Sequence, residues 1–329
     1  MMIDEDKQLK AFLRRVNNRL VHYSPEYLSF LKNVLPKVEI RLLKSFTEGQ
    51  LSGVMPVAIC TNSAFGAAIN SLPFFGSHGG PLAQDNRAMG SLRISFRDLC
   101  EEVKPSTITL VENPFSPLDA NDVEGFALTE VDDRIGQFTE LPADFSRFHV
   151  KTRNAIRKGQ KLNQSIECRD DSCSWDWMQK THELAIQQLG GVVKTDKVFN
   201  SLRSSFGEAA NLWVGSVSGK PISGLVIIRY GNTIEYFTPV VDEAHRNTQA
   251  LSALIYEVME YYAGTGATLW NWGGTWRSQD GVYRFKSRWG AYDKPYRYFN
   301  KVGNTELTRI SKGDVQEIFP YFYVYRYPE

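Results

Sequence analysis

The chain has few cysteines and histidines, almost no net charge and no long apolar run. Of its 329 residues, four are cysteine and five are histidine, and the formal net charge is +1. A membrane-spanning helix needs about 18 or more consecutive apolar residues, and no segment approaches that length. The first ten residues are charged, unlike those of a secretory signal. We therefore expect a cytoplasmic protein without membrane insertion.

The cysteines and histidines do not have the spacing of metal ligands. Cys60, Cys100, Cys168 and Cys173 are too scattered for a zinc site, and we expect them to be reduced thiols. The histidines include no H-E-x-x-H pair. No metal site is expected, and the near-neutral charge disfavours a general nucleic-acid-binding module.

Length and composition favour two α/β domains. A chain of 329 residues is longer than one hydrophobic core usually serves, and 42% hydrophobic with 23% charged residues is typical of a globular protein. Residues 50–55 and 221–226 share a Ser-Gly pair, and both follow a polar turn and open an apolar strand. This repeat indicates a duplication, with domains at residues 1–145 and 146–329.

Periodicity predicts the elements of the first domain. Residues 5–35 and 85–103 have helical patterns, and Ser24-Pro25 is typical of a helix start. Strands are expected at residues 38–46, 51–60, 107–112 and 125–131. Pro56 predicts an edge position or a bulge for the second of these strands. The aromatic tail from Phe319 onward is expected to form a last strand packed on one domain.

The most regular pattern lies in the second domain. Strands are predicted at 211–217, 222–230 and 233–241, followed by a polar loop at 242–247. A helix then presents one apolar face, made of Leu251, Leu254, Ile255, Val258, Met259 and Tyr262. A further strand is expected at 267–272.

The start of that helix is a candidate anion site. Asn247 is a suitable N-cap, and the unpaired amides of a first helical turn attract phosphate oxygens, as would Arg246. His245, Arg246, Asn247 and Thr248 are therefore the candidate donor-binding residues. The alternative is an ordinary capped helix with a solvated arginine.

Residues 150–162 are the most basic segment. They carry five cations and no acid, and Arg153, Arg157 and Lys161 align at four-residue steps on a helix. A diphosphate-bearing partner would relieve the repulsion between these charges, whereas the alternative is a solvated basic face. The next helix, near residues 175–189, carries His182, which is either a packed histidine or a proton acceptor that titrates near neutrality.

Four stretches together resemble the FemAB/FemX-like branch of the GNAT acyltransferase superfamily. They are Ser71-Leu72-Pro73-Phe74 with Gly79-Gly80-Pro81, residues 153–158 (Arg-Asn-Ala-Ile-Arg-Lys), Asn271-Trp272-Gly273-Gly274, and Phe285-Lys286 with Trp289-Gly290. The resemblance implies two tandem GNAT-like domains, each a mixed central sheet flanked by helices. It also implies an acyltransferase that forms amides.

The resemblance implies roles for individual residues. Phe285 and Lys286 would lie at the reacting carbonyl, where a cation stabilises the developing oxyanion. Without the resemblance, Lys286 would be interpreted as one more surface charge. The substrate-binding candidates are Arg153, Arg157, Asn271, Trp272, Gly273 and His182, with both arginines beside the acceptor cleft. The acceptor amine would attack directly, with no protein nucleophile, and the general base stays open among Asp242, Glu243, His245, Asp280, a water and a substrate phosphate.

One departure from the GNAT pattern concerns the donor. A usual CoA-binding loop contains glycines, whereas residues 246–251 (Arg-Asn-Thr-Gln-Ala-Leu) contain none. This disfavours acetyl-CoA and leaves aminoacyl-tRNA, a larger acyl-CoA or an acyl-carrier-protein thioester as a co-substrate, with no tightly bound cofactor. The expected acceptor is an amine of a nucleotide- or lipid-linked amino sugar or muropeptide of the cell envelope, and the expected state is a monomer or homodimer. The alternative is a non-catalytic, degenerate GNAT pair that binds a glycan precursor or tRNA.

Overall fold

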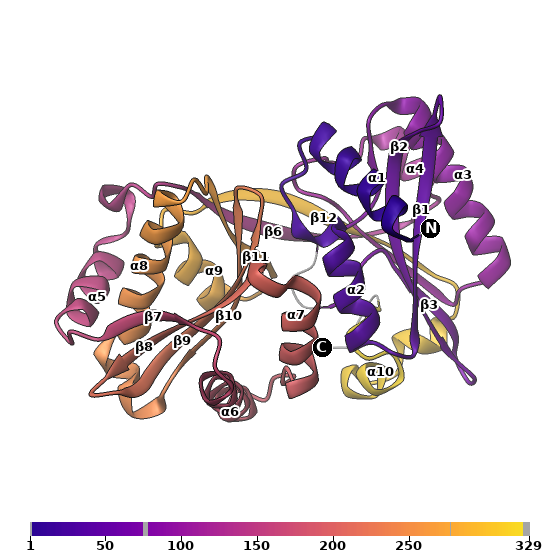
Figure 1. Ribbon diagram of the computed structural model, residues 1–329. Coiled ribbons are helices and arrows are strands. Elements are labelled where there is room, and N and C mark those ends of the chain that lie inside the picture. The colour runs from indigo at the N-terminus through magenta and orange to yellow at the C-terminus, as the bar shows by residue number, and fades with distance from the viewer. Residues whose placement is uncertain (1, 75–77, 277, 325–329) are drawn as a thin grey trace. The chain divides into compact units, whose positions relative to one another are not determined.

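The computed structural model describes residues 2–74, 78–276 and 278–324. The chain forms two compact units, which do not follow one another simply along the sequence. Unit 1 consists of Met1–Ile135 together with Lys294–Glu329, and unit 2 consists of Gly136–Asp293. Figure 1 shows the elements of both units.

Unit 1 is built on a sheet with the strand order β1-β2-β3-β5-β12. The strands are β1 (Val38–Thr47), β2 (Gln50–Asn62), β3 (Gly66–Asn70), β5 (Thr107–Val111) and β12 (Tyr292–Val302), and a short β4 (Leu82–Ala83) also pairs with β2. Neighbouring strands are antiparallel except β3 and β5, which are parallel.

The helices of unit 1 cover the two faces of this sheet. They are α1 (Met2–Arg15), η1 (Val21–Tyr23), α2 (Pro25–Val34), α3 (Asn86–Val103), α4 (Ala120–Gly125), η5 (Thr305–Thr308) and α10 (Lys312–Ile318). Side chains alternate along β2, so Val57 and Ile59 pack in the core beneath α3, whereas Ala58 and Cys60 pack against α10 and the segment after it.

Unit 2 is built on a sheet with the strand order β6-β11-β10-β9-β8-β7. The strands are β6 (Glu130–Glu140), which starts in unit 1, β7 (Ser165–Arg169), β8 (Ala210–Val217), β9 (Lys220–Tyr230), β10 (Thr233–Val241) and β11 (Leu269–Trp276). The helices are η2 (Phe145–Arg147), α5 (Val150–Gln160), α6 (Ser172–Gln188), α7 (Asp196–Phe206), η3 (Gly207–Ala209), η4 (Glu243–Thr248), α8 (Ala250–Gly264) and α9 (Asp280–Ser287). The pairings β7–β8, β8–β9 and β9–β10 are antiparallel, and β10–β11 is parallel.

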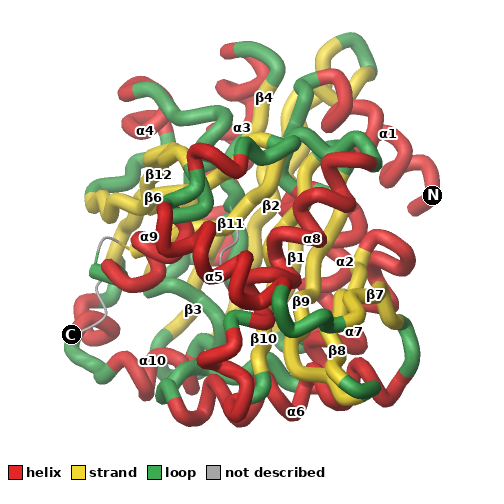
Figure 2. The backbone as a smooth tube through the Cα atoms, turned by 90° about the vertical axis from the view of Figure 1, so that its left-hand side faces the viewer, coloured by secondary structure: helices red, strands yellow, loops and turns green. Residues whose placement is uncertain are grey.

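Helices α5 and α8 pack closely at one glycine, as the neighbouring red helices of Figure 2 show. A Cβ atom at Gly159 would lie 2.3 Å from the carbonyl oxygen of Gln249 and 2.9 Å from Cβ of Ala253. Any side chain at this position would therefore push the helices apart. Gly159 brings the basic helix α5 against the beginning of α8.

The two units repeat one topology. A hairpin, a third strand, a helix and a parallel strand occur as β1-β2-β3-α3-β5 in unit 1 and as β8-β9-β10-α8-β11 in unit 2. In each hairpin a bulge follows the second residue pair from the turn. The Ser-Gly identity, by contrast, is shifted by one residue between the hairpins, because Gly53 lies opposite Ser45 and Ser223 occupies the corresponding place opposite Gly215. Topology and the bulge support the duplication better than that dipeptide does.

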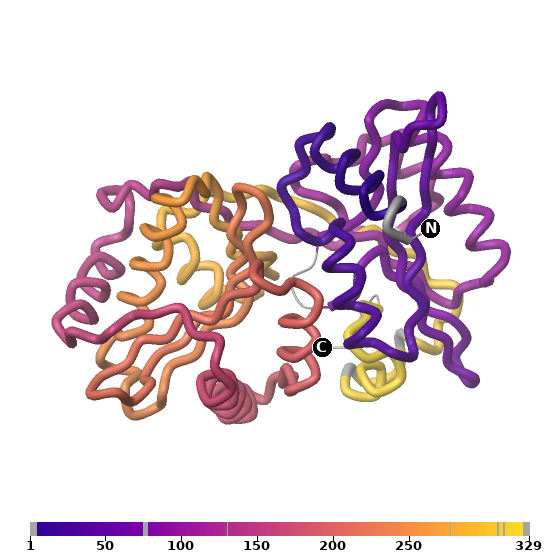
Figure 3. Tube along the Cα trace, in the orientation of Figure 1, coloured from indigo at the N-terminus to yellow at the C-terminus, as the bar shows by residue number. Residues whose placement is uncertain are grey.

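Each unit is completed by a strand that follows the other unit's parallel strand. After β5 the chain continues through α4 into β6, which lies beside β11, and after β11 it continues through α9 into β12, which pairs with β5. The C-terminal part of the chain, yellow in Figure 3, thus belongs to the same unit as the N-terminal part. The predicted boundary after residue 145 differs from this arrangement, because pairing between β12 and β5 draws residues 294–329 into unit 1.

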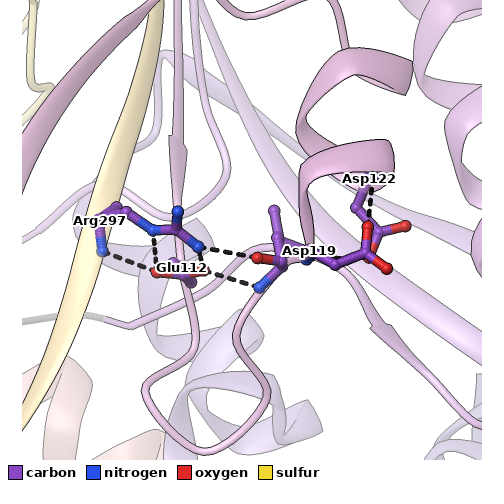
Figure 4. Close-up of polar contacts among 5 residues, drawn as sticks. Glu112, Asp119, Asp122 and Arg297 are labelled. Carbon is purple, nitrogen blue, oxygen red and sulfur yellow. Dashed lines mark hydrogen bonds and ion pairs between the residues drawn. The ribbon is translucent and has the colours of Figure 1, made fainter.

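An ion pair between the buried Glu112 and the partly exposed Arg297 fixes β12 to the end of β5 (Figure 4). The backbone amide of Arg297 donates to Oε2 of Glu112 at 2.9 Å, and Nη2 of Arg297 donates to Oε1 at 2.7 Å. The amide of Leu118 donates to the same carboxylate at 2.7 Å, just before Asp119 caps α4. Strand pairing alone would leave this carboxylate buried without a counter-charge.

Several predicted elements of unit 1 are confirmed. Ser24 caps a helix that begins at Pro25, and Asp85 caps α3, which ends at Val103. The predicted helix at 5–35 is interrupted, because α1 ends at Arg15.

Other predictions about unit 1 are wrong. Pro56 lies in an interior strand, in the gap between the part of β2 that pairs with β4 and the part that pairs with β3. The expected strand at 125–131 is the end of α4 and a turn, with β6 beginning only at Glu130. The tail from Phe319 to Val324 packs without forming a strand, and residues 325–329 lie outside the described residues.

Candidate functional site

The polar centre of unit 2 lies where β10 and β11 stop pairing. Their parallel register covers three residue pairs and ends at Glu235 and Asn271. Nδ2 of Asn271 donates to Oε2 of Glu235 at 2.6 Å, and the amide of Gly273 donates to Oδ1 of Asn271 at 2.8 Å. Gly273 has φ +76°, a left-handed conformation that suits glycine. The side chain of Asn271 therefore fixes a bend of β11 at Gly273, directly after the last pair, and this bend is called the turn below.

Lys286 reaches this turn from helix α9. Its side chain is buried, with 6% of the residue exposed. Nζ donates to Thr275 Oγ1 at 2.8 Å and to the carbonyl oxygens of Gly274 at 3.0 Å and Gly273 at 3.3 Å. Lys286 is therefore not a solvated surface cation, and its three N–H donors all have protein acceptors.

Burial shifts both charged groups of this centre towards their neutral forms. Desolvation raises the pKa of Glu235 to about 8, opposed by the hydrogen bond from Asn271 and by the charge of Lys286. Desolvation lowers the pKa of Lys286 to about 8, opposed by the charge of Glu235. A carboxyl group and an amine with neighbouring pKa values in one buried network are typical of a functional site.

The network continues from the buried Thr275 to Gln137, which is also buried, and from there to Ser287. Thr275 Oγ1 donates to Oε1 of Gln137 at 3.2 Å, and Nε2 of Gln137 donates to Ser287 Oγ at 2.9 Å. Gln137, Thr275 and Glu235 were missed by the sequence analysis. The one usable signal was Glu235, an acidic residue in the middle of an otherwise uncharged strand.

A pocket of about 410 Å³ lies beside this centre, between α5, the beginning of α8 and the end of α9. Three cations line it: Lys151, Lys158 and Arg288. Gln249 and Ser252 contribute the first turn of α8, and Phe285 and Trp289 form the aromatic wall. Positive side chains beside the N-terminus of a long helix favour a bound anion.

The predicted arginines of α5 do not line this pocket. Nη1 of Arg153 donates to the carbonyl oxygen of Ser146 at 2.7 Å, and the guanidinium carbon of Arg157 lies 5.6 Å from the centre of the Phe145 ring. The neighbouring Lys151 and Lys158 face the pocket instead. Helix α5 thus supplies the basic surface that was predicted, but through different residues.

The predicted donor loop does not line the pocket either, because the lining residues come a few positions later in the chain. His245 to Thr248 belong to η4, and α8 begins at Ala250 after Gln249, whose φ of +66° ends the short helix. Asn247 is exposed and does not cap α8, so that prediction is wrong. The hydroxyl of Thr248 donates to the carbonyl of His245 at 2.6 Å, while Arg246 is exposed. The pocket is lined by Gln249 and Ser252, immediately after this loop.

His182 packs inside unit 2. Its Nε2 accepts the backbone amide of Lys194 at 3.1 Å, and its ring lies edge-on to Phe199. Burial, reinforced by the charge of Lys194, lowers the pKa of His182 to about 4. The imidazole is therefore neutral near pH 7 and its Nε2 is engaged by the backbone, which fits the packed interpretation.

Asn271, Trp272 and Gly273 lie beneath the pocket wall and are buried. The Trp272 indole donates to Thr139 Oγ1 at 2.9 Å, and its ring lies 5.9 Å from Phe285. Phe285 itself is 38% exposed. Phe285 thus faces the pocket while Lys286, the next residue, faces the buried turn.

The described residues include neither a metal-binding cluster nor a membrane-spanning helix. No group of three or more His, Cys, Asp or Glu side chains in the described part of the chain is placed to hold a metal ion. Across residues 2–74, 78–276 and 278–324, no helix has both the length and the apolar character needed to cross a membrane.

Comparison with known proteins identifies the domain that contains most of this pocket. Residues 146–287 match the acetyltransferase (GNAT) domain family. This segment is a GNAT acyltransferase domain. It contains the turn at Gly273, Lys286 and eight of the ten residues that line the pocket, whereas Arg288 and Trp289 directly follow it. The protein is accordingly an acyltransferase that uses an acyl donor as co-substrate.

Solved structures extend the GNAT likeness to both units. A crystal structure of FemX is 14% identical, with a TM-score of 0.73 over 92% of this chain and 97% of that chain. A tandem GNAT protein from the clavulanic acid biosynthesis pathway is 13% identical (TM-score 0.53, 91% and 95% covered), and the C-terminal domain of a putative lysylphosphatidylglycerol synthetase from Agrobacterium fabrum is 11% identical (TM-score 0.57, 95% and 96% covered). No curated protein matches in sequence. The chain therefore has the tandem GNAT fold of the FemAB-like proteins, as predicted.

Proposed function

We propose that this acyltransferase joins an acyl or aminoacyl group to an amine of a cell-envelope precursor, and that its donor binds in the pocket of unit 2. The observation that carries the proposal is the set of three cations, Lys151, Lys158 and Arg288, around the first turn of α8. The acceptor would be a nucleotide- or lipid-linked amino sugar or muropeptide.

The charge of the pocket supports a phosphate-bearing donor. None of its ten lining residues is acidic, so nothing neutralises the cations locally. Coenzyme A, the prosthetic group of an acyl carrier protein and the acceptor end of tRNA all carry phosphates on the group that bears the acyl chain, in the first two at the far end of the pantetheine arm. Gln249 and Leu251 stand where a usual GNAT loop has glycine or another small residue, which favours a donor that is not wrapped tightly by this loop.

The reaction itself breaks one bond and forms one bond at the donor carbonyl. The neutral acceptor amine attacks the carbonyl carbon, the carbonyl oxygen becomes an oxyanion, and the C–S or C–O bond then breaks. The thiolate or alkoxide that leaves takes up the proton that the amine loses and becomes a thiol or a hydroxyl. Positive charge near the oxyanion lowers the barrier to this step.

Lys286 is the proposed source of that charge. Its longest hydrogen bond, 3.3 Å to the carbonyl of Gly273, is the one most readily exchanged for the oxyanion. Glu235 and Asn271 would act through the turn, because they fix Gly273 and so the place of the ammonium group. Phe285 would pack against the donor beside Trp289.

Support for a cell-envelope role comes from the similar structures. One of them is described as a lysylphosphatidylglycerol synthetase domain, whose named product joins an aminoacyl group to a membrane lipid, and another is FemX. Both share the tandem fold at low identity, so donor and acceptor must be determined directly.

The pocket is tested by titrating the protein with coenzyme A, acetyl-CoA and aminoacylated tRNA while measuring thermal unfolding. A ligand at a hundredfold its Kd should stabilise the folded protein by about 2.7 kcal/mol. The double substitution Lys151→Ala/Lys158→Ala should weaken binding by roughly tenfold to a hundredfold, and more salt should weaken wild-type binding. Lys161→Ala is the matched control, since Lys161 ends the same helix outside the pocket. Equal losses in both variants would contradict the proposed site.

One observation favours the alternative, a degenerate GNAT pair that binds a glycan precursor or tRNA without catalysis. All three N–H donors of Lys286 are engaged by the protein itself, as in a purely structural lysine. Full ligand affinity after Lys286→Met, together with no product from any donor in the wild type, would establish this alternative.

A further inference from the structure

Unit 1 has a pair of parallel strands that corresponds to the pair in unit 2. A different segment of the chain lies where the pairing of these strands ends. The pairing of β3 and β5 ends at Asn70 and Thr109, which correspond to Glu235 and Asn271 in unit 2. In unit 2 those two side chains bond to each other. In unit 1 Asn70 bonds to the C-terminal segment of the chain, and Thr109 donates to Asn300 of β12.

Asn70 holds the backbone of Tyr323 at both polar groups. Its Oδ1 accepts the Tyr323 amide at 2.8 Å, and its Nδ2 donates to the Tyr323 carbonyl at 3.0 Å. A primary amide that bonds one residue in this way imitates the peptide group of a neighbouring strand. The Thr109 hydroxyl donates to Oδ1 of Asn300 at 2.8 Å and lies 3.3 Å from the same Tyr323 carbonyl.

Neighbouring residues of the segment are fixed as well. The Phe74 amide donates to the Tyr321 carbonyl at 3.1 Å, and the two rings lie 5.3 Å apart. Phe322 and Val324 are buried in the core cluster that contains Ala68 of β3. Side chains two residues apart enter the core while the residue between them is held by its backbone, which is how an extended peptide binds at a sheet.

Unit 1 also lacks the features of the donor pocket. The first turn of α3 is already capped, because Asp85 accepts the amide of Ala88 at 2.8 Å and places a carboxylate where an anion would bind. The end of β5 is covered by the loop at Gly80, where a Cβ atom would lie 2.6 Å from the carbonyl oxygen of Val111. Both features exclude a phosphate-bearing acyl donor.

We infer that unit 1 contains a peptide-binding cradle, formed by Asn70, Thr109 and Phe74, which is occupied by residues 321–324 of the same chain in place of an acyl donor. The ligand class is an extended peptide with apolar side chains two residues apart. This place in unit 1 is therefore not a second donor site. This inference depends on unit 1 alone and stands whether or not the proposed donor pocket is correct.

Hydrogen exchange on the full chain tests the cradle. In the wild type the amide of Tyr323 should be protected, and Asn70→Leu should speed exchange of the segment 319–324 by at least tenfold, with Asn70→Asp intermediate because it keeps one acceptor. Ser45→Ala is the control, since Ser45 is a buried polar residue of the same unit that bonds to Ser52 instead. Unchanged protection in Asn70→Leu would overturn the inference.

A second experiment asks whether the cradle accepts a separate peptide. Phe322→Asp in the full chain should displace the segment, and a fluorescent peptide with the sequence of residues 319–324 should then bind, whereas the wild type should not bind it. Circular dichroism first establishes that the variant is folded. Binding of the peptide by the wild type and Phe322→Asp alike would overturn the inference, as would no binding by a folded variant.

Discussion

The two units differ in what occupies the place where their parallel strands stop pairing. In both, the parallel pairing of two strands ends after three residue pairs. Unit 2 fills this place with a charged network of Glu235, Asn271 and Lys286, which leaves an adjacent pocket open. Unit 1 fills it with its own chain through Asn70. The comparison teaches that a duplicated fold keeps its topology while the residue at one register position decides whether the place carries chemistry or packing.

The substitution Lys286→Met, which removes the cation from the network of unit 2, should have the largest effect, and the quantity affected is kcat/KM. Loss of the charge is expected to lower kcat/KM by about 10²–10³, the cost of removing one oxyanion-stabilising group. Donor affinity should change little, because Lys286 does not line the pocket. Steady-state kinetics and donor titration check this, with the exposed Arg284 on the same helix as the Arg284→Ala control. A loss of affinity equal to the loss in kcat/KM would show that Lys286 organises the pocket instead.

Gly159→Leu should damage unit 2 next most severely. The new side chain would meet the carbonyl of Gln249, so α5 must move away from α8. We expect a loss of about 2–4 kcal/mol in the free energy of unfolding, within the range for overpacked cores and larger clashes, and weaker donor binding. Gly264→Ala is the control, because a Cβ atom at Gly264 would contact nothing within 4 Å. Thermal unfolding of both variants, with and without donor, distinguishes the two glycines.

Glu112→Gln should affect unit 1 by a smaller amount. It removes the charge that pairs with Arg297 and anchors β12. Breaking a fully buried ion pair costs about 3–5 kcal/mol, and we expect about 2–3 kcal/mol here because Arg297 is partly exposed. Chemical denaturation measures the loss, and the activity of the remaining folded protein should be nearly normal. A matching loss of activity would show that unit 1 contributes to the transfer step.

The smallest expected effect is the pH dependence of stability conferred by Glu235. Burial raises its pKa to about 8, so the folded state binds a proton that the unfolded state releases at its ordinary, lower pKa. Wild-type stability should therefore fall as pH rises from the ordinary carboxyl range to about 8. Lys286 is charged in both states over most of that window and contributes in the opposite direction only above pH 8. Unfolding of Glu235→Gln, followed from pH 5 to 8, should show a weaker decline than the wild type, and parallel curves would contradict the assigned shift.

The local sequence patterns predicted much of the fold. The hairpin strands of unit 2, α8 and the Ser24 and Asp85 helix starts follow from apolar spacing and capping residues, which act within a few positions. The strand exchange could not be predicted in this way. The pairing of β12 with β5 joins residues nearly two hundred positions apart, and no local pattern records which unit a strand completes.

The site was predicted less completely. Phe285 lies at the pocket and Lys286 in the buried centre. The cations that α5 contributes to the pocket are Lys151 and Lys158, whereas Arg153 and Arg157 were predicted. Which side of a short basic helix faces inward depends on Gly159 and its contact with α8. Glu235 was missed because its importance comes from burial, which the sequence of one strand does not reveal.

The exchange of β6 and β12 also has a consequence for synthesis on the ribosome. The first residues of the chain belong to unit 1. Its sheet nevertheless lacks β12, and its cradle lacks residues 321–324, until residues 294–324 have emerged. Unit 2 has all its strands once β11 is made. Unit 2 is therefore expected to complete its sheet before unit 1 does. Until β12 has been made, β5 remains an unpaired edge strand of unit 1. Such an edge attracts other unpaired strands, so the pairing of β12 with β5 protects the N-terminal part of unit 1 from aggregation.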